Sequence, residues 1–466
     1  MSGIRHLRRI RASVVDHRDA PYHAAVPSAQ TSHRDNDIRN SLIVGASIAG
    51  FSLGAFAFYL VAGRALGPEA YGLVAALQSV LVVVGMLVIA PQWSIARVVA
   101  GSEGAGRIDA LAAYRRGLIL STAIAAGVGL LATIVTVILN EMRGGIPVAP
   151  LIITYASIVA LVPLLIACGA LQGERRYAGL AWSYASSGLL RAPLLAVFLI
   201  IPFLSDVDGA MLAGGTAIAL GAAWAVWLTR SDLRIATRPS AATWRNFVSA
   251  LPAVMVGLTG IAVLTNVDVI AAKLSFGGEQ AGLFGAASVV AKALLVVPQA
   301  LVMVLLPRVA ERESRQQRTG SLLAAGILVM ALTGALAMVL SVPLAEPIMN
   351  IAFGSEYASA SSLLVPFFGA TTLLGALLIL VNHHVARSDH RFVWAVGGLA
   401  VLQIVLLTMF STSDQAIIAV DATVAGIGLV VHEMIYFNTD ESMLRGAGAQ
   451  FATVLRRITH RGQGAE

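Results

Sequence analysis

Residues 66–77 read LGPEAYGLVAAL, and residues 276–287 read FGGEQAGLFGAA. Each stretch ends one long apolar run and opens the next, and each is followed by a Pro-Gln pair, at 91–92 and at 298–299. Two matching stretches in the same topological place predict two related halves within one membrane-embedded chain. The matched pairs are Gly67/Gly277, Glu69/Glu279, Gly72/Gly282, Leu73/Leu283 and Ala76/Ala286.

The composition is typical of a membrane protein. Hydrophobic residues make up 57% of the chain, charged residues 12%, and the mean hydropathy is +0.80, whereas soluble proteins carry about 25% charged residues. A single cysteine, Cys168, excludes an internal disulfide and a cysteine-based zinc site. The net charge of +7 comes from basic residues dispersed among short loops, which favours a role in membrane orientation over nucleic-acid binding.

Apolar runs long enough to span a bilayer, which takes about 20 residues each, occur twelve times along the chain. Gly and Pro lie inside several of them, as transmembrane helices tolerate. The sequence therefore predicts an all-α integral membrane protein with twelve transmembrane helices. The expected spans are residues 41–63, 72–96, 117–139, 148–170, 180–202, 210–229, 246–271, 281–306, 321–342, 361–383, 392–411 and 415–437.

The distribution of Lys and Arg predicts the orientation. With a cytoplasmic N-terminus, the inner segments hold 27 of the 32 Lys and Arg residues and the outer loops hold only Arg64, Arg143 and Lys273. Positive charge collects on the cytoplasmic side of membrane proteins, so we expect both termini to be cytoplasmic. Six spans in each half give the halves the same orientation, which makes the repeat parallel.

The chain divides into two lobes between two tails. We expect a disordered cytoplasmic tail at 1–39, an N-terminal six-helix lobe at 40–230 and a cytoplasmic linker at 231–245. A C-terminal six-helix lobe follows at 246–437, and a cytoplasmic tail at 438–466 ends the chain. The first tail has no apolar run after its basic start, so it is not a signal peptide.

Four motifs in order resemble the polysaccharide flippase branch of the multidrug/oligosaccharidyl-lipid/polysaccharide exporter superfamily. They are LGPEAYGL after the first span, VDVIAAKLSFGGEQAGLFGAASVV at 267–290, LLPRVAE at 305–311 and IAFGSEYASASSLLVPF at 351–367. The resemblance covers roughly residues 40–437. It implies two six-helix lobes around a central cavity, which rock between inward-open and outward-open states.

The resemblance also implies a cargo and a location. The cargo would be a polyprenyl-pyrophosphate-linked oligosaccharide moved from the inner to the outer leaflet of a plasma membrane, with membrane lipids and the glycosyltransferases or polymerase of the same pathway as partners. Thirty arginines against two lysines, and many alanines, are typical of a GC-rich bacterial genome. The peptidoglycan-precursor flippase is a relative that usually carries two further C-terminal helices, for which this sequence has no apolar run.

Arg191 and Lys292 lie near the middle of the fifth and eighth spans. A charge at mid-bilayer costs about 3 kcal/mol or more, so it normally faces a cavity or a partner. Two cations from different lobes suit a pyrophosphate, because Arg grips two oxygens and Lys acts as a point charge. The alternative is an internal ion pair or bonding to helix carbonyls. We place one acid, Asp268, well within a span, so it is the candidate partner for such a pair.

Asp268 and its neighbour Asn266 are candidates for binding a coupling cation. The alternative for Asp268 is a structural pair with Lys273, about one helical turn further on at the outer rim, and this pair is the favoured interpretation.

Arg97 and Arg308 end the second and eighth spans on the inner side. They are candidates for meeting cargo phosphates at entry. Arginines at this depth more often anchor a helix among the lipid headgroups, and we favour the anchoring role for both.

Gln92, Gln299 and Asn382 are polar groups within spans. A sugar headgroup needs such donors and acceptors, but hydrogen bonds between helices are an equal alternative. Pro91 and Pro298 are expected to bend their helices, and bent helices can line a cavity.

Enzymatic motifs are absent or incomplete. With lysine only at 273 and 292, the chain has no P-loop. His432 and Glu433 begin a metalloprotease-like motif, but Tyr436 stands where the second histidine would be. We therefore expect no catalytic residue, metal or cofactor.

The acidic pair Asp206 and Asp208 is similar to a motif of membrane glycosyltransferases, a class with large outer domains. Here the longest expected outer loop, about 343–360, has under twenty residues. The favoured hypothesis is therefore a flippase working by alternating access. The alternatives are a cation-coupled exporter of small molecules, which would favour buried acids, and a non-transport scaffold for a polysaccharide synthesis complex.

Overall fold

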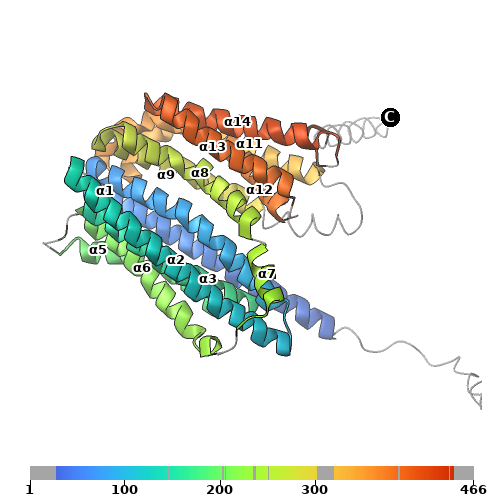
Figure 1. Cartoon of the computed structure of the whole chain (residues 1–466). Coiled ribbons are helices and arrows are strands. Elements are labelled where there is room, and N and C mark those ends of the chain that lie inside the picture. The colour runs from blue at the N-terminus through green and yellow to red at the C-terminus, as the bar shows by residue number, and fades with distance from the viewer. Residues whose placement is uncertain are drawn as a thin grey trace, which may run out of the picture.

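The structure is a computed structural model, and its described residues form helices and turns, with no strand among them. Figure 1 shows the blue-to-green N-terminal helices in one half of the molecule and the yellow-to-red C-terminal helices in the other. The described residues are 28–143, 147–201, 204, 206–234, 238–249, 251–301, 320–386, 389–439 and 441–445.

The N-terminal half begins with a helix of 73 residues, which bends at one non-helical residue, Gly67 (φ 71°, ψ 170°). Residues 28–39, expected in the disordered tail, are the start of this helix, and residues 1–27 lie outside the described part of the chain. The helices of this half are α1 (Ser28–Ala100), α2 (Ala105–Arg143), α3 (Val148–Gly173), α4 (Tyr177–Leu189), α5 (Arg191–Phe198) and α6 (Asp206–Leu228).

A short linker leads to the C-terminal half, which is again all-helical. The linker contains the 3-10 turn η1 (Asp232–Arg234) and the short helix α7 (Ala241–Ser249). The C-terminal half consists of α8 (Leu251–Ser275), α9 (Gly278–Lys292), η2 (Ala293–Leu295), α11 (Gly320–Ala352), η3 (Ser355–Leu363), α12 (Leu364–Ala386), α13 (His390–Phe410) and α14 (Asp414–Tyr436).

Ten helices of the described part are long and apolar enough to cross a membrane. The first, Ile43–Ala100, contains two of the predicted spans. The predicted span 180–202 is divided at Leu190 into α4 and α5, each too short to count. Pro193 explains this break, because it has no N–H for the carbonyl of Leu189 and its ring crowds that carbonyl. The predicted all-α, twelve-helix fold in two lobes is therefore confirmed.

Two boundaries differ from the prediction. The eighth span changes from α-helix to the 3-10 turn η2 just before Pro298, where the missing N–H leaves the α pattern without a donor. Helix α11 continues to Ala352 despite Pro343 and Pro347. The outer loop expected at 343–360 is therefore largely the end of α11 and the start of η3, and the compact rim contains little irregular chain.

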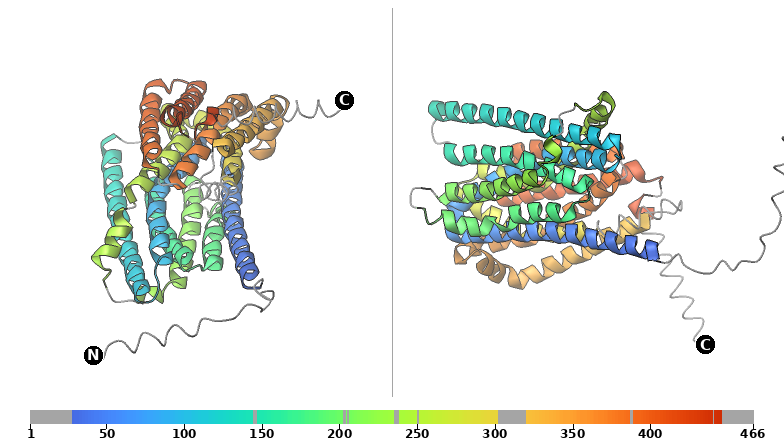
Figure 2. Two further views of the ribbon diagram at one scale, coloured as in Figure 1. Left: turned by 90° about the vertical axis from the view of Figure 1, so that its right-hand side faces the viewer. Right: turned by 90° about the horizontal axis from the view of Figure 1, so that it is seen from below.

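The two lobes meet along a shared hydrophobic core. Helix α1 packs against α8 and α9, and the main cluster of buried side chains includes Phe58 and Tyr71 from α1 together with Phe284 and Phe367 from the other lobe. The left view in Figure 2 shows the orange and red helices of the C-terminal half above the blue and green helices of the N-terminal half. Burial of this apolar surface holds the lobes together in this conformation.

The two repeated turns contact each other directly. We call the end of the molecule that carries them the repeat end. A Cβ added to Gly282 would lie 1.8 Å from the carbonyl oxygen of Pro68, and one added to Gly72 would lie 2.7 Å from the carbonyl oxygen of Gly278. Only glycine allows the backbones to approach this closely. One matched pair of the sequence repeat, Gly72 and Gly282, therefore forms a close contact between the lobes.

Aromatic side chains reinforce this contact. Tyr71 of α1 packs edge-on against Tyr357 of η3, with ring centroids 6.1 Å apart. The hydroxyl of Tyr357 donates a hydrogen bond of 2.8 Å to the carbonyl oxygen of Gly63, and the Nε of Arg64 donates one of 3.1 Å to the carbonyl of Ala352. The lobes are therefore closed against each other at the repeat end.

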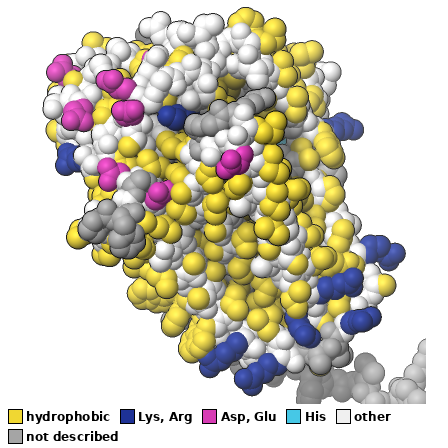
Figure 3. Space-filling view, turned by 60° about the vertical axis from the view of Figure 1, so that its left-hand side comes forward, with side chains coloured by type: hydrophobic (Ala, Val, Ile, Leu, Met, Phe, Trp, Pro, Cys, Tyr) yellow, Lys and Arg dark blue, Asp and Glu magenta, His cyan; other side chains and the backbone are white. Residues whose placement is uncertain are grey.

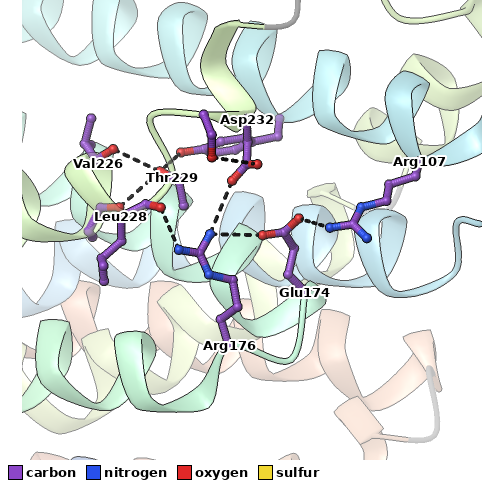
Figure 4. Close-up of polar contacts among 10 residues, drawn as sticks. Arg107, Glu174, Arg176, Val226, Leu228, Thr229 and Asp232 are labelled. Carbon is purple, nitrogen blue, oxygen red and sulfur yellow. Dashed lines mark hydrogen bonds and ion pairs between the residues drawn. The ribbon is translucent and has the colours of Figure 1, made fainter.

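An ionic network ties together the helices of the N-terminal lobe at the opposite end, which we call the linker end. Figure 4 shows Arg176 between Glu174 and Asp232, with Arg107 on the other side of Glu174. The nitrogen–oxygen distances are 2.7 Å for Arg107–Glu174, 3.2 Å for Arg176–Glu174 and 3.4 Å for Arg176–Asp232. The network joins the start of α2, the α3–α4 turn and the segment after α6.

Helix α7 is fastened to the N-terminal lobe, although the chain runs on into the C-terminal lobe. The side chain of Asp109 accepts hydrogen bonds from Ser240 and Thr243 at the start of α7. The hydroxyl of Ser94 donates a 2.7 Å bond to the carbonyl of Phe247, whose ring is buried in a cluster of that lobe. The linker is therefore a packed element with fixed contacts.

Candidate functional site: a buried ion pair and a buried arginine

Asp268 and Lys292 form an ion pair inside the C-terminal lobe. The ammonium of Lys292, the last residue of α9, lies 2.8 Å and 2.7 Å from the two carboxylate oxygens of Asp268 on α8. The Asp268 side chain is 1% exposed and that of Lys292 is 18% exposed. The structure thus pairs Asp268 with Lys292 rather than with Lys273, and the two predicted site residues lie together in one lobe.

A second acid, the half-buried Asp421 of α14, belongs to the same cluster. Its carboxylate accepts a 2.7 Å hydrogen bond from the amide of Gln403 on α13. The same carboxylate interacts electrostatically with Asp268 and Lys292. Ser288 donates a long 3.5 Å bond to Asp268. The sequence interpretation missed Asp421, although a charge inside the predicted span 415–437 was the signal that could have found it.

The cluster contains two carboxylates and one ammonium, of which Asp268 is fully buried and the other two are half-buried. One ammonium cannot neutralise both carboxylates, and an uncompensated buried charge is costly. The excess negative charge of the two carboxylates can be offset by a bound cation. The arrangement of Asp268, Lys292 and Asp421 can therefore exchange positive charge, which is the chemistry that a coupling site needs.

Arg191 is buried in the N-terminal lobe. Arg191 is the first residue of α5, directly after the break at Leu190, and it is 5% exposed. Its Nε donates a 3.1 Å hydrogen bond to the carbonyl of Ser187, and its guanidinium carbon lies 5.3 Å from the centroid of the Phe51 ring. Among the described residues it forms no ion pair, so no acidic side chain there neutralises it.

The predicted polar residues within spans are mostly bonded locally. Gln92 is buried and accepts a 2.8 Å bond from the hydroxyl of Tyr184. The amide of Asn382 donates to the carbonyl of Leu378 in its own helix. Asn266 likewise donates within α8, and its bonds do not reach Asp268. Gln299 has an exposed side chain.

The predicted entry arginines lie on the linker end or outside the described chain. Arg97 is exposed and lines a cavity of about 690 Å³ together with Asn246 and Ser249 of α7. Arg308 lies outside the described residues. A second cavity of about 640 Å³ is lined by three arginines that the sequence interpretation did not single out, Arg115, Arg116 and Arg238.

The fold is similar to several solved structures. One is a multidrug resistance MATE family transporter of the MOP superfamily in an inward-facing conformation, with a TM-score of 0.62, 16% identity and coverage of 82% of this chain and 94% of that chain. Another is the lipid II flippase MurJ in an inward closed conformation, with a TM-score of 0.65, 13% identity and coverage of 89% and 92%.

A third is the eukaryotic MATE transporter AtDTX14, with a TM-score of 0.59, 14% identity and coverage of 89% of this chain and 99% of that chain. No protein-family model and no curated protein matches the sequence. At these low identities the likeness establishes the fold alone. The chain has the two-lobe, twelve-helix fold of MATE transporters and MurJ.

Proposed function

We propose that the protein is a transporter that flips a polyprenyl-pyrophosphate-linked oligosaccharide from the inner to the outer leaflet of a plasma membrane by alternating access. The observation that carries the proposal is Arg191, a buried guanidinium within a predicted span and without an ion pair in the described chain. The shared fold supports it, because MurJ, which is described as a lipid II flippase, is built in the same way.

Arg191 has the chemistry that a diphosphate requires. A buried cation without a counter-ion is costly, so the site is expected to bind an anion during the transport cycle. The guanidinium can hold two phosphate oxygens at once, which a lysine cannot do. The break between α4 and α5 places Arg191 at the first residue of a short helix, beside the ring of Phe51 on α1.

Lys292 enters the proposal in a different role from the one expected from the sequence. While Asp268 is ionised, the Lys292 ammonium is neutralised and is a weak ligand for a phosphate. A proton or cation that neutralises Asp268, shared with Asp421, would release Lys292 to face the cargo. The C-terminal cluster would thus couple uptake of positive charge to binding of the diphosphate.

Charge is distributed along the molecule as this direction of transport requires. Figure 3 shows acidic side chains gathered at one end and Lys and Arg mainly at the other. With the cavity lined by Arg115, Arg116 and Arg238 on the cytoplasmic side, an anionic headgroup would be attracted at entry. Outward movement of negative charge is favoured by about 2.3 kcal/mol per charge per 100 mV when the cell interior is negative.

The test is transfer of a fluorescent polyprenyl-pyrophosphate oligosaccharide across vesicles that contain the purified protein. Arg191→Ala and Arg191→Lys are compared with wild type, and Arg234→Ala, an exposed arginine in the linker, serves as the control. We expect transfer to fall by about tenfold or more in Arg191→Ala, partial recovery in Arg191→Lys, and no change in the control. Transfer that is unaffected by both Arg191 variants would overturn the assignment of the site.

A second candidate is a cation-coupled exporter of small molecules, which the buried carboxylate of Asp268 and the half-buried one of Asp421 favour. The same vesicles can be loaded with a cationic dye and given a proton or sodium gradient. Gradient-driven dye transport that is lost in Asp268→Asn, together with no transfer of the lipid-linked oligosaccharide by wild type, would select the exporter over the flippase. Neither activity in wild type would favour the scaffold.

A further inference from the structure

A cluster of histidine and acidic side chains lies at the end of α12, away from the site described above. His383 and His384 lie in the last turn of α12, which ends at Ala386. Glu441 lies in the segment that follows α14. One ring nitrogen from each histidine and one carboxylate oxygen of Glu441 lie within 4.8 Å of one another. The three residues are 3%, 0% and 8% exposed.

The distances within the cluster have the spacing of ligands around one ion. The Nδ1 of His384 lies 3.7 Å from an oxygen of Glu441 and 3.6 Å from an oxygen of Asp389. These separations are longer than a hydrogen bond. Ligands at about 2.0 Å from a tetrahedral Zn²⁺ are about 3.3 Å apart, so the two separations from His384 exceed that spacing by only a few tenths of an ångström, and His383 lies within 4.8 Å of His384 and Glu441.

A second layer of hydrogen bonds orients the same groups. The Nε2 of His384 lies 3.0 Å from the Nε2 of His432. If Nδ1 of His384 binds an ion, its Nε2 carries the hydrogen and donates it to His432, which is the usual arrangement of a metal-bound histidine. The hydroxyl of Tyr436 donates a 2.6 Å bond to Asp389, and the backbone N–H of Arg391 donates to the other oxygen of the same carboxylate.

We infer that His383, His384 and Glu441, with Asp389 as the fourth group, form a binding site for a divalent first-row transition-metal ion such as Zn²⁺. Two imidazoles and two carboxylates are ligands that Zn²⁺ accepts. The Asp389 side chain is 26% exposed and so offers the ion a path from solvent. A bound ion would fasten the segment after α14 to the end of α12 and the turn before α13.

The test measures Zn²⁺ binding to the full chain purified without a polyhistidine tag, stripped with a chelator and then reconstituted. We expect about one Zn²⁺ per chain to survive gel filtration, and a higher unfolding temperature with the metal than with the chelator. Glu441→Gln and His383→Gln are expected to raise the Kd for Zn²⁺ at least about tenfold. Tyr436→Phe is expected to raise it about tenfold, because the hydrogen bond to Asp389 is lost.

Glu346→Gln is the matched control, because Glu346 is an exposed acid at the far end of α11. Co²⁺ replaces Zn²⁺ as a second probe, and its visible absorption reports tetrahedral ligation by nitrogen and oxygen. Equal unfolding temperatures of wild type and Glu441→Gln in chelator would establish that the variant folds. Zn²⁺ binding by Glu441→Gln as tight as in wild type, or no stoichiometric binding by wild type, would overturn the inference.

Discussion

Gly282 is the residue at which the two halves of the molecule come closest. Its missing side chain leaves room for the carbonyl of Pro68, and an alanine Cβ would lie 1.8 Å from that oxygen. Gly282→Ala is therefore expected to push the repeat end open. Overpacking costs about 1–3 kcal/mol, and about 1.4 kcal/mol changes an equilibrium tenfold.

The opening can be measured by the rate at which a thiol reagent modifies a cysteine placed at Ala281, which is 1% exposed in the closed form. We expect the Gly282→Ala background to raise this rate about tenfold. Gly277→Ala is the control, because Gly277 has no atom within 4 Å of an added Cβ and an ordinary φ of −62°. Equal rates in the two backgrounds would contradict the proposed role of the contact.

The Asp268–Lys292 pair predicts a non-additive effect on stability. Asp268→Asn leaves the Lys292 ammonium largely buried without its partner, and breaking a buried pair on one side costs about 3 kcal/mol. The double variant Asp268→Asn/Lys292→Gln removes both charges and should recover most of that loss. Thermal unfolding in detergent measures both effects, and a double variant less stable than Asp268→Asn would exclude a direct pair.

Lys273→Gln is the control for this pair, because Lys273 is the partner that the sequence favoured for Asp268. The spacing along one helix indicated Lys273 as a partner for Asp268, whereas Lys292 lies on the next helix. Only the packing of α8 against α9 reveals that contact. The sequence could name Asp268, Lys292 and Arg191 as buried charges, but it could not say which of them share a partner.

The ionic network at the linker end joins elements rather than single residues, and it makes part of the stability of the N-terminal lobe depend on pH. Burial raises the pKa of Asp232 above its usual value of 3.8; Glu174 raises it further, and Arg176 opposes both. A folded-state pKa above the unfolded value means that the folded chain holds the proton more tightly. The contribution of Asp232 to stability is therefore largest below the unfolded pKa and is lost as the pH rises through the folded pKa.

Asp232→Asn removes this titration. We expect the unfolding temperature of wild type, measured relative to Asp232→Asn, to fall as the pH rises from about 4 toward neutrality. The comparison cancels the other carboxylates, because both chains carry them. A difference that is flat or that grows with pH would show that Arg176 outweighs burial at this site.

Several elements were predictable because their causes are local. The twelve apolar runs and the repeated turns follow from composition and spacing, and the structure retains all of them. The break at Leu190 was also encoded, by Pro193, but a hydropathy profile does not register a proline. The continuation of α11 to Ala352 was hidden by Pro343 and Pro347, which usually end a helix in water and which a packed membrane helix tolerates.

Seen as a whole, the molecule separates its charges between two ends, and this predicts its orientation. Arg234 lies at the linker end and Glu346 near the repeat end, and both are exposed. In a Cys168→Ala background, a reagent that cannot cross membranes should label a cysteine at 346 in intact cells and label one at 234 only after lysis. The reverse pattern would invert the proposed direction of entry.

The lobe architecture followed from the sequence, whereas its conformation did not. Two six-helix halves were implied by the repeat, but closure at the repeat end depends on contacts of Tyr71 and Gly282 with segments far away in the chain. The second acid, Asp421, belongs to the candidate site because α14 packs beside α8. Long-range packing is the information that single-sequence patterns lack.

The close contact between the two repeated turns also limits which amino-acid substitutions the chain can accept. Pro68 and Gly282 belong to different halves, yet the carbonyl of one occupies the space that a side chain of the other would need. A larger residue at 282 is therefore expected to be inherited only together with a change around 68. Gly72 and Gly282, the matched glycines that make this contact, are therefore expected to tolerate substitution only together with the backbone that each of them faces.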